Sequence, residues 1–564
     1  MPTYSWPSGI SASSDQSDVS PLVASLLQHR GVGQTDRDSV ADFLAPNYDR
    51  HLHDPLLLHD MERACERIES ALDEKQHIAV FADYDCDGIP GAVVAHDFFT
   101  TAKHDNLTVY IPHRHYEGFG LSVSAVETLH EKGVQLIITI DCGSTDVAAV
   151  ARANELGLDV IITDHHEPGA ELPEALAIVN PKLGEYPFTE LCGAAVMWKL
   201  AIALLSRRDY GVVPGYEKWW LDMVGVATIA DMVPLVGENR VLATYGLRVL
   251  RKSRRPGLQQ LLKKAKADQR YLTEDDVGFT IGPRVNAASR MDTPEDAFNL
   301  LTALTVEDAV SKVAHLEELN QTRKTTVAQM TKDVHKRVQQ LDEMPDVLVF
   351  GDPSWRPSLV GLTAGKLADE HGRPAFVWGK DGNGKYKGSC RSGGNVSVVE
   401  LLRAIPQHLH EHGGHHVAGG FTIRDESIHD FPAALQQAYA DMGTNALVQE
   451  EKQIDAVLTL DEVTKWLHTD LQKLAPYGMS NPQPLFAFKD VRPERVEQFG
   501  KLNDHLKLVF MTENGRLEAI AFFTKPDSYS RVPQATTPLT LLAHVEESRF
   551  MGRPQIRLRV VDIL

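Results

Sequence analysis

Short apolar runs alternate with helical patterns through the first half of the chain. Nearly continuous apolar runs occupy residues 77–81, 136–140 and 160–163. This pattern is typical of strands that are buried on both faces. Residues 91–99, which follow the first run, have the apolar spacing of a helix. Because strands and helices that alternate are typical of a parallel sheet, we expect an α/β domain over residues 46–304.

One uninterrupted helical pattern follows this domain. Apolar residues recur at helical spacing from Val306 to Leu341, and this stretch contains no Gly or Pro. At about 1.5 Å per residue, the helix would be about 54 Å long. We expect it to form a connector over residues 305–342, joined to a second, smaller α/β domain over residues 343–447 that opens with the apolar run 347–350.

The last part of the chain changes to short alternating strands. Residues 506–510, 517–522, 539–545 and 555–560 have this pattern, and Asn514-Gly515 marks a hairpin turn between the first two. About five strands in about 110 residues suit an OB-fold-like β-barrel over residues 448–564, although any small barrel would fit equally. Residues 1–45, rich in Ser, Asp and Pro at their start, are expected to form a lead-in segment.

Composition excludes some classes of protein and leaves others open. Five cysteines without a C-x-x-C pair argue against a disulfide framework and a structural zinc site. No apolar run reaches membrane-spanning length and the N-terminus lacks a signal-peptide layout, so we expect a cytoplasmic protein that does not enter a membrane. The net charge of −20 opposes general nucleic-acid binding but is compatible with a basic groove that admits one threaded strand.

Carboxylates are concentrated directly after the first predicted strand. Asp83, Asp85 and Asp87 lie within five residues, and carboxylates this close repel one another unless a cation lies among them. A calcium loop of the EF-hand kind begins similarly, but its twelfth position requires a bidentate Glu and is Val94 in this chain. The loop therefore predicts a different metal site, at the carboxyl end of a parallel strand.

Two more predicted strands end in potential metal ligands. Asp141 follows the run 136–140, and Asp164-His165-His166 follows the run 160–163. Asp231 ends the segment 224–230, whose pattern is ambiguous between helix and strand. One such Asp alone could equally be a helix cap or a turn residue. Together these residues offer more ligands than one ion needs, which favours a site with two ions. Oxygen and imidazole ligands without a thiolate suit Mn²⁺ or Mg²⁺ better than zinc.

The order of these motifs resembles the DHH phosphoesterase superfamily, and the flanking sequence resembles its RecJ single-strand exonucleases. The resemblance spans roughly residues 45 to 564 and includes residues 117–121, 191–194, 282–288, 387–392, 413–415 and 474–482. It implies a DHH catalytic domain, a DHH-associated C-terminal domain and an OB fold. This chain departs from the usual pattern at Ser289, where Gly is common, and at Trp355-Arg356-Pro357-Ser358, which replaces Trp-His-x-Gly.

The resemblance also implies roles for individual residues. The expected metal ligands are Asp83, Asp85, Asp87, Asp141, His165 and Asp231. The residues expected to act beside the metals in catalysis are Asp164, His166 and His415. The residues expected to bind the terminal 5′-phosphate and the DNA are Arg114, Arg284, Asn286, Ser389, Arg391, Gly413 and Gly414.

The implied activity is a metal-dependent 5′→3′ exonuclease that shortens single-stranded DNA to 5′-mononucleotides in recombination and repair. Its expected form is a monomer, with a helicase or a single-strand-binding protein as partner. One alternative is a DHH phosphodiesterase on short RNA or dinucleotides, against which the long C-terminal domain speaks. The other is a non-catalytic replication scaffold, which would lack metal carboxylates that are all present in this chain.

Overall fold

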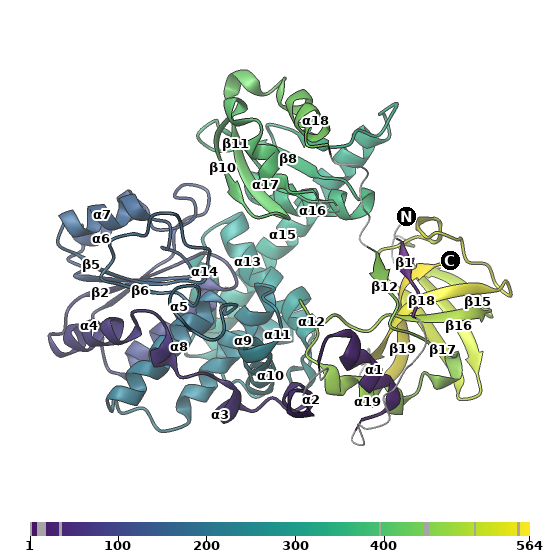
Figure 1. The fold of residues 1–564 in the computed structure, drawn as a ribbon, viewed down its shortest axis with the longest axis horizontal. Coiled ribbons are helices and arrows are strands. Elements are labelled where there is room, and N and C mark those ends of the chain that lie inside the picture. The colour runs from purple at the N-terminus through teal and green to yellow at the C-terminus, as the bar shows by residue number, and fades with distance from the viewer. Residues whose placement is uncertain are drawn as a thin grey trace. The chain divides into compact units, whose positions relative to one another are not determined.

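The structure is a computed structural model that describes residues 3–7, 19–32, 37–393, 396–443, 451–500, 503–549 and 553–564 (Figure 1). The chain forms two compact units. One contains residues 52–233 and 237–449, and the other contains residues 1–51, 234–236 and 450–564. Within the described ranges, no helix is both long enough and apolar enough to cross a membrane.

The first lobe of the larger unit is built on a five-stranded parallel sheet. Its strand order is β3-β2-β4-β5-β6, with bounds Leu107–Tyr110, Ile78–Ala82, Leu136–Ile140, Asp159–Thr163 and Ala177–Val179. The three predicted strands are β2, β4 and β5, and the apolar runs predicted them because β2 and β4 are buried along their whole length. Helices α6 (Val123–Glu131) and α7 (Val147–Glu155) pack on one face. Helices α4 (Met61–Asp73), α5 (Gly88–Thr101) and α8 (Gly193–Arg207) cover the other (Figure 1).

A helical layer continues this lobe. Its main helices are α9 (Leu221–Ala230), α10 (Gly237–Leu250), α11 (Pro256–Ala265), α13 (Gly282–Met291) and α14 (Glu295–Leu301). The ambiguous segment before Asp231 is therefore a helix, and Asp231 follows its last residue. The predicted connecting helix is α15, Val306–Val338, which ends three residues before the predicted Leu341 and packs against α11, α13 and α14.

The second lobe of this unit has a five-stranded sheet with one parallel pair. The order is β10-β11-β9-β8-β7, with bounds Leu409–Gly414, Ala418–Ile423, Tyr386–Arg391, Ala375–Lys380 and Leu348–Gly351, and β7 and β8 are parallel. Helix α16 (Pro357–His371) shares a core with Met330 and Val334 of α15. Helices α17 (Val398–Arg403) and α18 (Phe431–Asp441) pack in a separate core with β9, β10 and β11.

The smaller unit contains a seven-stranded sheet. Its order is β13-β14-β18-β19-β17-β16-β15, with bounds Ala456–Val457, Phe486–Val491, Leu539–Ser548, Gln555–Ile563, Gly515–Ala521, His505–Thr512 and Arg495–Phe499. The predicted hairpin is present, because Thr512 pairs with Gly515 across the turn. The α/β fold with a connecting helix and a C-terminal strand-rich domain is thus confirmed.

The N-terminal segment is part of the smaller unit rather than a separate lead-in. Helix α1 (Pro21–His29) places Val23, Leu26 and Leu27 in the core of the seven-stranded sheet, all fully buried. Strand β1 (Tyr4–Ser5) pairs with β12 (Lys452–Gln453). The expected lead-in over residues 1–45 is therefore corrected for residues 3–7 and 19–32, because α1 has an apolar face; the Ser- and Asp-rich residues 8–18 lie outside the described residues.

Candidate metal centre and phosphate pocket

The loop between β2 and α5 carries the first three carboxylates. Asp83 is buried, and Asp85 accepts hydrogen bonds from the backbone N–H groups of Asp87 (2.7 Å) and Gly88 (3.2 Å). A Cβ at Gly88 would lie 2.3 Å from the carbonyl oxygen of Asp83. The loop is therefore too tight for any other residue at Gly88, and this tightness holds the carboxylates at the start of α5.

The N-terminus of α8 holds two of the aspartates in place. Both carboxylate oxygens of Asp87 accept backbone hydrogen bonds at this helix end, from Gly193 (2.6 Å) and Ala194 (2.8 Å). Asp141 has a left-handed backbone (φ 62°), and a Cβ at Gly193 would lie 2.5 Å from its Cβ. The close approach of α8 therefore brings Asp87 and Asp141 to the same edge of the sheet.

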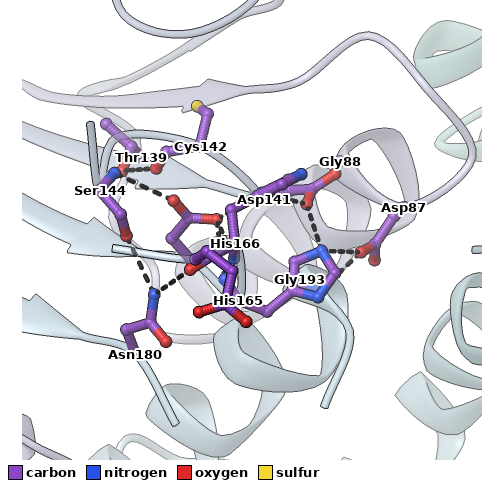
Figure 2. A network of polar contacts seen from close by, with 12 residues as sticks. Asp87, Gly88, Thr139, Asp141, Cys142, Ser144, His165, His166, Asn180 and Gly193 are labelled. Atoms are coloured by element: carbon purple, nitrogen blue, oxygen red, sulfur yellow. Dashed lines mark hydrogen bonds and ion pairs between the residues drawn. The ribbon is translucent and has the colours of Figure 1, made fainter. Parts of the chain in front are cut away.

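His165 lies among carboxylates from three different loops. Its Nε2 is 3.1 Å from Oδ1 of Asp141. It is 3.7 Å from Oδ2 of Asp87 and also 3.7 Å from Oδ2 of Asp231. Figure 2 shows His165 with Asp141 and Asp87. Burial, and then the neighbouring His166, lowers the pKa of His165 to about 3. The imidazole is therefore neutral near pH 7, which is the form that binds a metal ion.

Asp164 orients the second histidine. Its carboxylate accepts backbone hydrogen bonds from Ser144, His165 and His166 and lies 2.8 Å from Nδ1 of His166. Although burial opposes ionisation of Asp164, His166 holds the pKa of this carboxyl well below its usual range. Burial acts against a charged His166 as well, but Asp164 raises the pKa of the imidazole. Asn180 completes the network by donating to Ser144 Oγ and to the His166 carbonyl, both at 3.0 Å (Figure 2).

The remaining carboxylates repel one another. Burial, and then neighbouring carboxylates, raises the pKa of Asp87 to about 7 and of Asp231 to about 9, and raises the pKa values of Asp83 and Asp141 well above the usual range. In the described chain, Oδ1 of Asp83 and Oδ1 of Asp141 are buried and make no hydrogen bond. Buried carboxylate oxygens of this kind are satisfied by a proton or by a bound cation, and the crowding of several carboxylates favours a cation.

The predicted metal ligands form two groups that suit two ions. In each group, one ligand atom per residue lies within 4.8 Å of the others. One group is Asp87, His165 and Asp231, and the second is Asp83, Asp85 and Asp141. Asp141 also groups with His165 and His166, so it lies where both ions could share it. The carboxylate and imidazole donors suit Mn²⁺ or Mg²⁺.

Guanidinium groups gather beside these carboxylates. Arg114 lies over the ring of Tyr84 at 4.8 Å, and Arg391 on β9 donates to its neighbouring carbonyl of Cys390. Ser389 is also on β9, and its side chain and that of Arg391 both pack against α16. A Cβ built on Gly361 of α16 would lie 3.3 Å from each of these side chains. The structure thus brings together three of the predicted phosphate-binding residues: Arg114, Ser389 and Arg391.

Arg290 joins this pocket, and the sequence analysis did not select it. Its Nη1 donates to the carbonyl of Ser358 at 2.8 Å. Burial, and then repulsion from Arg114, Arg323 and Arg391, lowers the pKa of Arg290 to about 9, whereas Asp85 acts in the opposite direction. Arg290 is therefore within electrostatic reach of the predicted metal ligand Asp85 and of the predicted phosphate-binding residues Arg114 and Arg391.

Arg284 lies in a different contact. Its guanidinium pairs with Glu317 of α15 (Nε to Oε2, 2.7 Å) and donates to the carbonyl of Thr280. A carboxylate thus already balances the charge of Arg284, and its assignment to the phosphate pocket stays a prediction. Asn286, two residues on, keeps a buried Oδ1 that has no hydrogen-bond partner in the described chain, and its role stays a prediction.

The Gly-Gly-His element lies at the end of β10. Gly413, Gly414 and His415 are exposed, and the His415 N–H closes the hairpin by donating to Ala418. Across the residues that the structure describes, no hydrogen bond or ion pair joins His415 to the carboxylates, so its role also stays a prediction. Phe119, a second residue that we did not select, lies with its ring 5.3 Å from that of His166 and is 51% exposed.

Comparison with known proteins supports the same division of the chain. The sequence matches the DHH family N-terminal domain over residues 77–228, the DHHA1 domain over 344–441 and the RecJ OB domain over 454–562. The solved structure of RecJ in complex with Mn²⁺ from Thermus thermophilus superimposes with a TM-score of 0.80 and 28% identity, covering 97% of this chain and 76% of that one. A second Thermus structure, in complex with Mg²⁺, gives a TM-score of 0.73.

Curated relatives agree over most of the sequence. The single-stranded-DNA-specific exonuclease RecJ of Bacillus subtilis is 34% identical over 97% of this chain and 68% of its own length. The protein of the same name from Haemophilus influenzae is 31% identical over 96% of this chain and 95% of its own length. The chain belongs to the RecJ family of single-stranded-DNA-specific exonucleases.

Proposed function

We propose that this protein is a two-metal exonuclease that releases 5′-mononucleotides from the 5′ end of single-stranded DNA. One observation carries the proposal. Buried carboxylates that need cations lie beside three arginines, Arg114, Arg290 and Arg391, for which no carboxylate in the described chain lies within ion-pair distance. A site with both features suits a phosphodiester that ends in a phosphate.

The residues of the centre divide the work. The six predicted ligands would hold the ions, which when bound neutralise the scissile phosphate and provide hydroxide near neutral pH. Asp164 accepts from Nδ1 of His166 and raises the pKa of the imidazole, and in the doubly protonated ring Nε2 can donate to a phosphate oxygen. Phe119 offers an exposed ring on which a base can stack.

The arginine pocket gives the reaction its direction. Arg114, Arg290 and Arg391, with Ser389, would bind the terminal 5′-phosphate, because guanidinium groups bind phosphate through paired N–H donors. The strand would then continue only in the 3′ direction from the scissile bond. A pocket that ends at the terminal phosphate favours exonuclease over endonuclease action.

The cellular setting extends the proposal. Release of nucleotides from a 5′ end suits recombination and repair, where a helicase or a single-strand-binding protein would supply the single strand. We place the enzyme in the cytoplasm, as a monomer that uses Mn²⁺ or Mg²⁺. These statements rest on the family and on the chemistry of the substrate.

The test uses one single-stranded oligonucleotide, labelled at either its 5′ or its 3′ end, incubated with Mn²⁺. The 5′ label should leave at once as a mononucleotide, while the 3′ label shortens through a ladder. Asp141→Ala should bind the strand without cutting it. Early loss of the 3′ label would overturn the assigned direction, and binding without cleavage by the wild type would favour a scaffold.

A further inference from the structure

Helices α15 and α16 pack side by side (Figure 1), and both of them line a groove of about 400 Å³. This volume is at the lower end of the range of small-molecule sites, about 300–1,000 Å³. Lys332, His335 and Lys336 of α15 and Lys366 of α16 contribute to its walls. None of them belongs to the metal centre or to the predicted phosphate-binding residues. The α15–α16 groove is therefore a feature that the proposed activity does not use.

The positive charge of this groove is only partly balanced. Glu370 of α16 contacts both Nε2 of His335 (2.6 Å) and Nζ of Lys366 (3.8 Å). In the part of the chain that the structure describes, no carboxylate lies within 4.0 Å of the ammonium group of Lys332 or of Lys336. These two lysines lie four residues apart on one face of α15, where like charges repel. Three ammonium groups and one carboxylate leave an excess of two positive charges in the groove, although the whole chain carries −20.

Thr331 also lines the groove, with a hydroxyl group that has no partner. The residue is 4% exposed, and among the described residues its Oγ1 finds no hydrogen bond. Other threonines of the same helix differ, because the hydroxyls of Thr322, Thr325 and Thr326 each donate to the carbonyl four residues earlier. A buried hydroxyl without a partner costs free energy, and a ligand oxygen that accepts its hydrogen bond removes this cost.

The charge and the size of the groove together suit a small phosphorylated molecule. A phosphate monoester carries about −1.5 to −2 near neutral pH, which matches the excess of two positive charges. Its oxygens accept hydrogen bonds from ammonium groups and from a hydroxyl group. A free phosphate ion alone would leave most of the groove to water, because 400 Å³ is the liquid volume of about thirteen water molecules. Ala328 and the methylene stems of the lysines are apolar surface that suits a sugar or a base.

We infer that the α15–α16 groove is a second ligand site, which binds a phosphate monoester of the size of a nucleoside monophosphate. Lys332 and Lys336 neutralise the phosphate, and Thr331 donates a hydrogen bond to one of its oxygens. The inference goes beyond the proposed function and does not depend on it, because the residues of the groove take no part in binding the metal ions or the DNA end.

The experiment places a reporter at the groove. The five cysteines of the chain are buried, so a cysteine introduced at the surface can be labelled selectively. Gln339→Cys places an environment-sensitive fluorophore where α15 ends and the groove opens. The labelled protein is titrated with deoxyadenosine monophosphate in EDTA, and a saturable change of fluorescence is expected. Lys332→Gln combined with Lys336→Gln should raise the Kd about tenfold.

Two controls locate the signal. Lys263→Gln combined with Lys264→Gln removes the same charge from exposed positions of α11 and should change the Kd less than about twofold. Arg391→Gln weakens the proposed pocket for the DNA end and should also leave the Kd unchanged. Thr331→Val keeps the shape of the side chain without its hydroxyl and should raise the Kd about two- to tenfold.

Several results would overturn the inference. One is a Kd that rises as much in the α11 control pair as in the groove pair. Another is the absence of any response at about 1 mM ligand, both with the label at Gln339 and with a label at the exposed Gln340, which does not line the groove. Deoxyadenosine that binds as tightly as its monophosphate would exclude the phosphate contact. Inorganic phosphate that binds as tightly would exclude a ligand of nucleotide size and leave a site for the free ion. The strand-shortening assay with Mn²⁺ tests the proposed function separately.

Discussion

Arg290 and Ser358 exchange two hydrogen bonds. Nη1 of Arg290 donates to the carbonyl of Ser358, and the Ser358 hydroxyl donates to the carbonyl of Arg290, both over 2.8 Å. This contact joins the end of α13 in the first lobe to the start of α16 in the second. Ser358 is one of the positions at which the chain departs from the common Gly, and Gly could not donate the second bond. Arg290, which is within electrostatic reach of Asp85, is thus positioned by the second lobe.

Replacement of Arg290 should therefore damage substrate binding strongly. We expect Arg290→Gln to lower kcat/KM on a 5′-phosphorylated strand by about ten- to hundredfold, because charge-assisted hydrogen bonds are worth about 1.5–3 kcal/mol. Arg284→Gln is the matched control on the same helix. It breaks the pair with Glu317 and should change kcat/KM by less than about fivefold. If Arg284→Gln causes the larger loss, the result supports Arg284 and contradicts Arg290 as the phosphate-binding residue.

The carboxylates should make the metal-free protein less stable than a variant that cannot bind metal. We expect Asp141→Asn to raise the unfolding temperature in EDTA, because it removes one of several buried charges that repel one another. The same variant should lose the increase in unfolding temperature that Mn²⁺ gives the wild type, since a ligand stabilises only the state that binds it. It should also lose nuclease activity.

Asp105→Asn is the control for this experiment, because Asp105 is an exposed carboxylate outside the two ligand groups. It should change neither the unfolding temperature in EDTA nor the response to Mn²⁺. If Asp141→Asn unfolds at a lower temperature than the wild type in EDTA, the charge of Asp141 is already balanced without a metal ion.

The metal ligands could be predicted because each lies at the end of a local pattern. A buried strand followed by Asp or His is visible in a few residues, and parallel strands bring such ends to one edge of the sheet. The choice between Arg284 and Arg290 could not be made in this way. Both lie in one short helix, and only the position of Glu317 on α15 shows which of them has a carboxylate partner.

Two other features depended on contacts between distant parts of the chain. The segment ending at Ala230 is apolar on all sides because it is buried among other helices, so periodicity could not separate helix from strand. The apolar face of α1 packs on strands that begin more than four hundred residues later. A segment that looks like a lead-in in isolation therefore belongs to a core.

A buried ion pair in the first lobe gives a pH-dependent prediction. Arg255 contacts Asp97 at 2.5 Å and Asp222 at 2.9 Å. Burial alone would raise the pKa of Asp97, but Arg255 and His96 together hold it below its usual value. A lowered pKa in the folded state contributes stability above the unfolded value of about 3.9, and this contribution is lost as pH falls through the folded value.

We expect Asp97→Asn to lower the free energy of unfolding by about 3 kcal/mol at pH 7, and by progressively less as pH falls below about 4. The measurement compares the urea midpoint of the wild type with that of the variant, once at pH 7 and once at a pH below about 4. A difference that stays constant between them would mean that Asp97 contributes through packing and not through its charge.

The last prediction concerns the N-terminal helix. Leu26 is fully buried in the core of the smaller unit, so Leu26→Ala should lower the free energy of unfolding of that unit by about 2–5 kcal/mol. Gln28→Ala, on the exposed face of the same helix, is the control and should leave stability nearly unchanged. Thermal unfolding followed by calorimetry measures both variants. Because the metal ligands lie in the larger unit, Mn²⁺ should still raise the unfolding temperature of that unit in Leu26→Ala. A Leu26→Ala variant as stable as Gln28→Ala would show that residues 21–29 are a lead-in after all, held on the surface of the barrel and not within its core.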